Sequence, residues 1–61
     1  MKIYCVTYEN GEDIHIELIT TDYDEAMIRI SILPREYEYG ILTTWENGEE
    51  IKSMRFDRSV E

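Results

Sequence analysis

Side-chain catalysis requires a nucleophile, a base or an acid in a suitable setting, and this sequence offers few candidates. His15 is the only histidine and Cys5 is the only cysteine. A histidine base needs a nucleophile and an orienting partner, and a reactive thiolate needs electropositive surroundings. We expect His15 to lie at the solvent edge of a strand and Cys5 to be a small buried hydrophobe. The sequence therefore predicts no catalytic residue and no enzyme activity.

Neighbouring carboxylates are the second kind of group that could carry chemistry. Glu12 and Asp13 are adjacent, and Asp22 and Asp24 are separated by one residue. Neither pair belongs to a calcium loop, because the glycine and the terminal glutamate of that loop are missing. Cysteine and histidine residues with the spacing of a zinc site are also missing. We expect no metal and no cofactor, and the ordinary uses of these carboxylates are helix capping and solubility.

The charge of the chain indicates what kind of partner it has. Fourteen acidic and six basic side chains give a net charge of −8, and residues 1–25 hold seven of the acids against one lysine. Such a surface repels phosphate backbones and anionic lipids and attracts basic surfaces. We expect a protein partner with a basic surface, and neither direct nucleic-acid binding nor membrane binding. A single cysteine and no signal peptide or long apolar run favour a cytoplasmic location.

Two Asn-Gly dipeptides organise the elements that position these groups. Asn10-Gly11 and Asn47-Gly48 each lie between runs of β-branched and aromatic residues, and Asn-Gly is the strongest short signal for a two-residue hairpin turn. In the first hairpin, Glu9 then lies opposite Glu12. The predicted core face holds the pairs Ile3–Leu18, Cys5–Ile16 and Thr7–Ile14. The opposite face holds the pairs Tyr4–Glu17, Val6–His15 and Tyr8–Asp13.

The second hairpin follows the same logic, with an alternative. With Asn47-Gly48 as the turn, the predicted pairs are Tyr39–Phe56, Ile41–Met54, Thr43–Lys52 and Trp45–Glu50. A bulge near Gly40 would shift this pairing.

Between the hairpins, residues 22–33 have the pattern of a helix. Asp22 and Glu25 have the spacing of a capping box, and Pro34 disfavours helix at Leu33. An apolar stripe at helical period consists of Tyr23, Ala26, Met27, Ile30 and Leu33. Ile28 and Ile32 lie nearly opposite the stripe, where they contact either the second hairpin or a partner. A strand over Met27–Leu33 is the alternative, because isoleucine favours β structure.

The elements together predict one domain, residues 1–61, of the α+β class. Two hairpins and one helix give the order ββαββ, with the helix on one face of a four-stranded antiparallel sheet. One helix covers only one face, so we expect Tyr4, Val6 and Tyr8 on the other face. They are either a contact surface for a second protein or a second copy, or ordinary surface residues.

As a class, a very short, acidic, cofactor-free hairpin-and-helix domain resembles the small inhibitors encoded by bacteriophages. These include anti-CRISPR proteins, anti-restriction DNA mimics and uracil-DNA glycosylase inhibitors. The order of elements and the segment Glu50-Ile-Lys-Ser-Met-Arg-Phe-Asp57 are similar to the dimeric glycosylase inhibitors. The resemblance implies a viral protein that acts in the cytoplasm of a host cell.

The leading hypothesis is a non-enzymatic inhibitor or regulator that occupies the basic surface of a nucleic-acid-handling enzyme. The expected contact acids are Glu9, Glu12, Asp13, Glu17, Asp22, Asp24 and Glu25. Tyr4, Tyr8 and Trp45 are expected as aromatic anchors, and Ile28, Ile32 and Val6 as residues for self-association into a homodimer. The alternative hypothesis is an accessory or structural subunit that binds a protein partner through an apolar face.

Overall fold

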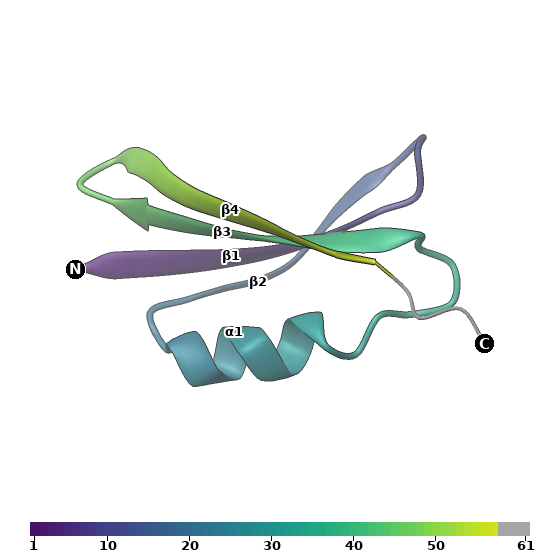
Figure 1. Ribbon diagram of the computed structural model, residues 1–61, viewed down its shortest axis with the longest axis horizontal. Helices are drawn as coiled ribbons and strands as arrows, with labels where there is room; N and C mark the ends of the chain where they lie inside the picture. Colours follow the sequence, from purple (N-terminus) through teal and green to yellow (C-terminus); the bar gives the residue numbers. More distant parts are fainter. Residues whose placement is uncertain (58–61) are drawn as a thin grey trace.

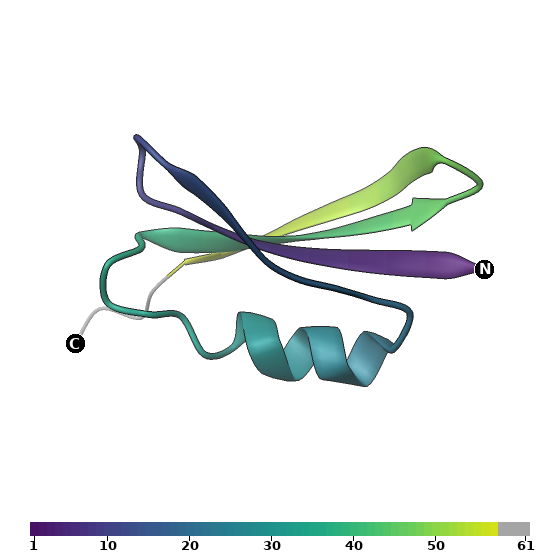
Figure 2. The same ribbon diagram turned by 180° about the vertical axis from the view of Figure 1, so that it is seen from behind.

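The computed structural model describes residues 1–57, so the last four residues of the predicted domain lie outside the described part. The elements in chain order are β1 (Lys2–Glu9), β2 (Ile14–Thr20), α1 (Tyr23–Ile30), β3 (Tyr39–Glu46) and β4 (Glu49–Asp57). The strands form one antiparallel sheet in the order β2-β1-β3-β4, and α1 lies against one face of it (Figure 1; Figure 2 from behind). The predicted ββαββ fold is confirmed.

The core lies between the helix and the face of the sheet that it covers, which we call the covered face. The buried hydrophobic residues are Val6, Tyr8, Ala26, Ile30 and Leu42. Val6 pairs with Leu42 across β1 and β3, and Ala26 and Ile30 from the helix close over them. The apolar residues packed around this cluster are Tyr4, Leu18, Met27, Leu33, Tyr37 and Phe56. Burying this apolar area supplies the main driving force for folding.

Helix α1 begins where the sequence predicted and ends earlier. The Asp22 side chain accepts hydrogen bonds from the backbone N–H groups of Asp24 and Glu25, so Asp22 is the N-cap. Glu25 does not complete a capping box; its carboxylate accepts a hydrogen bond from the Thr20 hydroxyl. The helix ends at Ile30, with Ser31 as its C-cap. The alternative of a strand over Met27–Leu33 is wrong.

The predicted register of the first hairpin is wrong, because its loop is longer. Glu9 lies opposite Ile14, and the loop runs from Asn10 to Asp13. The Asn10 side chain accepts hydrogen bonds from the N–H groups of Glu12 and Asp13, which stabilises this wider turn, and Gly11 has the positive φ of 91° that the turn requires. A bulge then places Glu17 between Ile16, opposite Thr7, and Leu18, opposite Val6.

The two faces of β1 are therefore exchanged relative to the prediction. Val6 and Tyr8 lie in the core, whereas Ile3, Cys5 and Thr7 lie on the face without a helix, which we call the open face. The reason lies in β3, which pairs with β1 along its whole length. On the covered face β3 offers Leu42 beside Val6 and Gly40 beside Tyr8, and the small glycine leaves room for Ile30. On the open face it offers Thr43 beside Cys5.

The second hairpin has the predicted turn and a bulge in a different place. Trp45 pairs with Glu50, as predicted, and Asn47 and Gly48 both have positive φ. The register then shifts by one residue between Thr44 and Trp45, so that Thr44 pairs with Lys52 and Gly40 pairs with Phe56. The bulge therefore lies next to the turn and not near Gly40. It moves Phe56 and Met54 onto the covered face, where Phe56 packs against the core.

Candidate functional site

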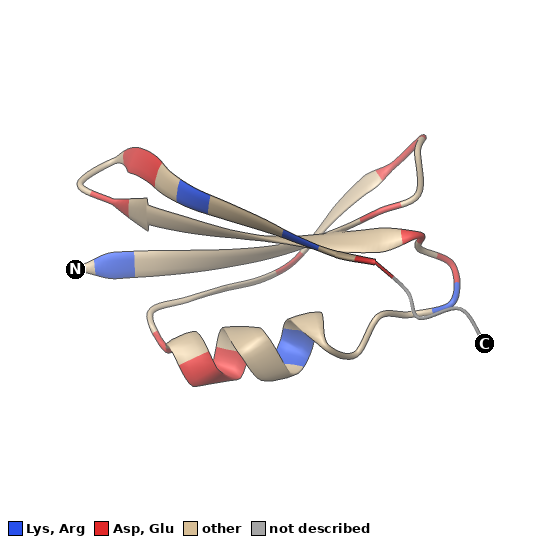
Figure 3. Ribbon diagram, in the orientation of Figure 1, with Lys and Arg blue, Asp and Glu red and all other residues tan. Residues whose placement is uncertain are grey.

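The predicted acidic array is divided between the two ends of the molecule. Glu9, Glu12 and Asp13 lie at the tip of the first hairpin, and Asp22, Asp24 and Glu25 lie at the start of α1 (Figure 3). These two positions are at opposite ends of a molecule whose longest dimension is 37 Å. A charge at one end is thus screened from a charge at the other, since the Debye length is about 8 Å in physiological salt. The seven acids do not form one surface.

Several of these carboxylates have a partner within the chain. Asp22 caps the helix, Glu25 accepts a hydrogen bond from Thr20, and Glu9 accepts one from the Tyr39 hydroxyl at 2.8 Å. Glu12, Asp13 and Asp24 are exposed. Local structure therefore accounts for half of the six end carboxylates.

Glu17, on the bulge of β2, connects the sheet to the helix. One of its carboxylate oxygens lies 2.6 Å from Nη1 of Arg29, and the other lies 2.9 Å from Nε2 of His15. The hydrogen bond from Arg29, followed by the one from His15, lowers the pKa of Glu17 below its ordinary value. The His15 ring also stacks on the rings of Tyr8 and Tyr37, at centroid distances of 6.3 and 5.8 Å. This arrangement ties β2 to α1, and its members hold one another in place.

The predicted aromatic contact surface of Tyr4, Val6 and Tyr8 does not exist. Val6 and Tyr8 are fully buried under the helix, so they are not available for a partner or for self-association. Tyr4 is half-buried and makes an edge-to-face contact with Tyr23 at a centroid distance of 5.3 Å. Ile28, on the helix, and Ile32, just after the helix ends, are both exposed. Their predicted role in self-association stays a prediction.

The open face includes five of the six residues predicted for the core face of the first hairpin: Ile3, Cys5, Thr7, Ile14 and Ile16. Three isoleucines of the edge strand β2 point outward there and remain largely exposed: Ile14 at 70%, Ile16 at 59% and Ile19 at 62%. Ile3 from β1 and Trp45 from β3 continue this surface across the sheet. A group of large apolar side chains exposed side by side marks a binding surface more often than isolated ones do. This surface is the candidate functional site.

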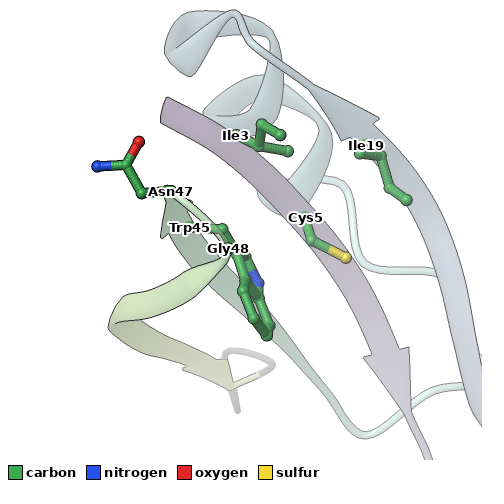
Figure 4. A pocket seen from close by; sticks show the side chains of 6 residues that line it. All are labelled: Ile3, Cys5, Ile19, Trp45, Asn47 and Gly48. Atoms are coloured by element: carbon green, nitrogen blue, oxygen red, sulfur yellow. The ribbon is translucent and has the colours of Figure 1, made fainter. Parts of the chain in front are cut away.

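The apolar part of the open face contains a pocket of about 340 Å³ (Figure 4). Its lining comes from three adjacent strands and one turn, and consists of Ile3, Cys5, Ile19, Trp45, Asn47 and Gly48. Ile3 lies opposite Trp45, and Cys5 lies opposite Ile19, so the strand pairing itself sets the shape of the pocket. Ligand pockets in proteins range from about 300 to 1,000 Å³. This pocket therefore has room for one large side chain.

The open face becomes polar toward β4 and toward the first hairpin. Arg55 lies over the ring of Tyr39, with its guanidinium carbon 3.9 Å from the ring centroid, and it also donates a hydrogen bond to Asp57 at 2.9 Å. The Tyr39 hydroxyl in turn donates to Glu9, which raises the pKa of Tyr39. Arg55 is thus already engaged with two side chains of its own chain. The carboxylates of this region give the surface a negative border.

Tyr4, Tyr8 and Trp45 were all expected as contact residues. Of these three, Trp45 is the exposed one. Its indole nitrogen donates to the Thr43 hydroxyl at 3.3 Å, and 37% of the residue is accessible. Ile3, Ile16 and Ile19 were missed as exposed residues, and Cys5, which was expected to be a buried hydrophobe, is half-buried on the open face. The pattern of β1 and β2 alone holds no signal for them, because the choice of face depends on the pairing of Val6 and Tyr8 with Leu42 and Gly40 of β3.

The described residues contain no group of three or more histidine, cysteine, aspartate or glutamate side chains that could hold a metal ion. Within the same residues, no helix has the length and apolar character needed to cross a bilayer.

Comparison with known proteins finds no matching family model, no matching curated protein and no matching solved structure.

Proposed function

We propose that this chain is a non-enzymatic regulator or inhibitor that binds a protein partner through the open face of its sheet. The observation that carries the proposal is the continuous exposure of Ile16, Ile19, Ile3 and Trp45 on the face that no helix covers. Aromatic and aliphatic side chains of this kind provide most of the binding energy at protein interfaces. The face thus combines an apolar area over β2 and the adjoining ends of β1 and β3 with polar side chains toward β4, and interfaces generally combine the two kinds of surface.

The charge of the chain supports a basic partner over a second copy. Each copy has a net charge of −8, so two copies repel each other, whereas a basic protein is attracted. The charged side chains on the open face have the same sign on balance: Glu9, Glu50 and Asp57 against Arg55. Acidic side chains beside an apolar area raise the association rate with a basic partner and select against acidic ones. The partner is therefore a protein with an apolar patch bordered by lysine or arginine.

A second candidate is an inhibitor of the DNA-mimic type that occupies the basic surface of a nucleic-acid-handling enzyme. Exposure of Glu12 and Asp13 at the tip of a rigid hairpin favours it, because the tip can enter a basic cleft. The division of the acids between two ends favours the open face as the main contact, with the tip as an additional one.

A matched pair of substitutions tests the proposal. Ile16→Lys introduces a positive charge on the open face, and Ile28→Lys makes the same change on the outside of the helix. The two isoleucines are 59% and 63% exposed, so both variants keep the core intact. We expect capture of the natural partner from a cell lysate to be lost with Ile16→Lys and kept with Ile28→Lys. Equal capture by the two variants would refute the proposal.

The same capture assay distinguishes the second candidate, DNA-mimic binding, from binding through the open face. Glu12→Lys combined with Asp13→Lys reverses the charge at the hairpin tip without touching the apolar surface. If the DNA-mimic type of binding applies, this double variant loses capture, and capture by the wild type falls steeply as salt is raised. If the open face dominates, the double variant binds more slowly and still retains the partner.

A further inference from the structure

We infer that the pocket between Ile3, Ile19 and Trp45 receives one large apolar side chain of the partner, and that a lysine or arginine beside this side chain contacts Glu50. The inference rests on the proposed function and names the chemistry that the open face recognises. The recognised element is a short segment that combines an apolar anchor with a neighbouring positive charge. Three features of the pocket support it.

The first feature is that the pocket is shaped by paired strands. Ile3 and Trp45 are directly opposite across β1 and β3, and Ile19 lies opposite Cys5 on the other side of β1 (Figure 4). Directly opposed side chains of paired strands project from the same face, at separations that the backbone fixes. The volume of about 340 Å³ lies at the low end of the range for ligand pockets. A preformed pocket of this size fits an aromatic, leucine or methionine side chain at little cost in ordering.

The second feature is the state of the Trp45 indole. Its only polar group, the Nε1–H, donates to Thr43 Oγ1 within the same strand. The indole therefore has no unmet hydrogen bond, and its accessible ring surface is available for apolar contact or for a cation. Tryptophan in such a position is the residue type most enriched among the residues that dominate binding energy.

The third feature is the charge next to the pocket. Glu50 is the direct partner of Trp45 across β3 and β4, so its carboxylate leaves the sheet on the open face beside the indole. The nearby lysines do not neutralise it there. Lys2 pairs with Glu46, and Lys52 pairs with Thr44, which is buried on the covered face. Among the described residues, Glu50 is in none of the ion pairs. Arg55 also lies on the open face, but it donates to Asp57 and lies over the ring of Tyr39. A partner cation next to the anchor therefore meets an acid that none of these bases pairs with.

A selection of random dodecapeptides displayed on phage tests the inference. The wild-type chain is the bait, and the Ile19→Lys variant, whose substituted residue is 62% exposed, is the counter-selection bait. We expect the enriched peptides to share one large apolar residue with a lysine or arginine within two positions of it. Binding of a synthetic peptide of that sequence should shift the fluorescence of Trp45, the only tryptophan of the chain.

Two substitutions then separate the contribution of the apolar anchor to peptide affinity from that of the charge. With the synthetic peptide, Ile19→Lys should raise the dissociation constant about tenfold or more, because the anchor loses its wall. Glu50→Gln should raise it severalfold and weaken its dependence on salt. Ile28→Lys, on the helix, serves as the matched control for Ile19→Lys and should leave the dissociation constant unchanged. A circular dichroism spectrum identical to that of the wild type confirms that each variant is folded.

The inference is overturned if no peptide is enriched, if enriched peptides lack either the anchor or the positive charge, or if Ile19→Lys and Ile28→Lys bind the peptide equally. These results are separate from the test of the proposed function, which uses Ile16, outside the pocket. Loss of partner capture with Ile16→Lys together with a failed peptide selection refutes the pocket and leaves the open face. A successful peptide selection together with normal partner capture by Ile16→Lys refutes the open face as the site of the natural partner.

Discussion

The phenolic oxygen of Tyr8 lies 2.8 Å from the backbone carbonyl oxygen of Arg29, in the last turn of α1. The same hydroxyl is 2.9 Å from the carbonyl oxygen of Ile32, so one donor is shared between two acceptors. Carbonyl groups at the end of a helix have no partner within the helix and need one from elsewhere. The Arg29 carbonyl accepts from the backbone N–H of Ile32, and Tyr8 adds a second donor from β1, which fixes the end of the helix over this strand.

Removal of this hydroxyl should weaken the domain. We expect Tyr8→Phe to lower the free energy of unfolding by about 1–2 kcal/mol, because the hydrogen bonds of the buried hydroxyl are lost while the packing of the ring is kept. Urea unfolding at neutral pH measures the change. Tyr23→Phe is the control, since Tyr23 is 44% exposed and its hydroxyl should contribute less than about 0.5 kcal/mol. Equal losses for the two variants would contradict the role assigned to Tyr8.

The same residue makes stability depend on alkaline pH. Burial, and secondarily the charge of Glu17, raises the pKa of Tyr8 above its ordinary value of 10.0. The unfolded chain therefore loses this proton at a lower pH than the folded chain does. The stabilisation is fully present below the unfolded pKa and is lost as the pH rises through the folded pKa. Tyr39 adds to the effect in the same direction, because its pKa is raised by its hydrogen bond to Glu9.

Urea unfolding from about pH 9 to pH 11 should show this loss in the wild type. In Tyr8→Phe the decrease should be smaller, since only the Tyr39 contribution remains. An unchanged slope in the variant would show that Tyr8 does not titrate differently in the folded and unfolded states.

Glu17 should make stability depend on pH in the opposite direction, with a loss in acid. Its pKa is lowered from an ordinary value of 4.5, chiefly by the hydrogen bond from Arg29. A lowered pKa means that the stabilisation is present above the unfolded pKa and disappears as the pH falls through the folded pKa. We expect Glu17→Gln to be less stable than the wild type at neutral pH and to lose less stability on acidification.

A matched control is available in Asp57→Asn, which removes another carboxylate that pairs with an arginine. Both partners of the Arg55–Asp57 pair are more exposed than those of the Arg29–Glu17 pair, and it joins two residues of the same strand. It should therefore change the acid dependence less. Unfolding curves at pH 7 and near pH 3 compare the two variants; a larger effect of Asp57→Asn would contradict the ranking.

The sequence was sufficient for the elements and for the start of the helix, because these depend on local chemistry. The Asp22 side chain accepts hydrogen bonds from N–H groups in the first turn of α1. Asn47 and Gly48 adopt the positive φ angles that a two-residue hairpin turn requires. The first hairpin was different. Asn10 stabilises a longer loop through its side chain. A bulge at Glu17 then shifts the alternation of β2 by one residue, so that Ile16 and Ile19 both lie on the open face. Neither feature follows from the alternation of apolar residues within one hairpin.

The candidate site could be predicted only in part for the same reason. Trp45 was paired correctly with Glu50, since it lies next to a turn whose geometry the sequence determines. Ile16 and Ile19 were not, because the face that they occupy depends on which side of β1 the helix covers. That choice is made by contacts between β1 and β3, which are far apart in the sequence.

Stability measurements distinguish the two assignments of the faces directly. If Ile16 lies on the open face, at 59% exposure, Ile16→Thr should change the free energy of unfolding by less than about 0.5 kcal/mol. If it were in the core, the loss would exceed about 1 kcal/mol. Leu42→Ala is the reference for a core position and should cost about 2–5 kcal/mol. A large loss for Ile16→Thr would restore the core face that the hairpin pattern predicted.

Gly40 provides the sharpest test of the core, because its role is the absence of a side chain. A Cβ atom at this position would lie 2.7 Å from Cδ1 of Ile30 and 3.4 Å from both a ring carbon of Tyr8 and the carbonyl oxygen of Thr7. We expect Gly40→Ala to cost about 1–3 kcal/mol through overpacking. Gly48→Ala is a control of another kind: nothing lies within 4 Å of its Cβ position, and its cost comes from the positive φ alone.

The atom in the way identifies a compensating change. Ile30→Val deletes the Cδ1 methyl group that the new Cβ meets, and by itself it should cost about 0.5–1.5 kcal/mol. In the double variant the added and the deleted methyl groups offset each other, so the combined loss should be smaller than the sum of the two single losses. Urea unfolding of the four proteins measures this coupling. Additive losses would mean that Gly40 and Ile30 are not in contact, and that the helix does not pack over β3 at this point.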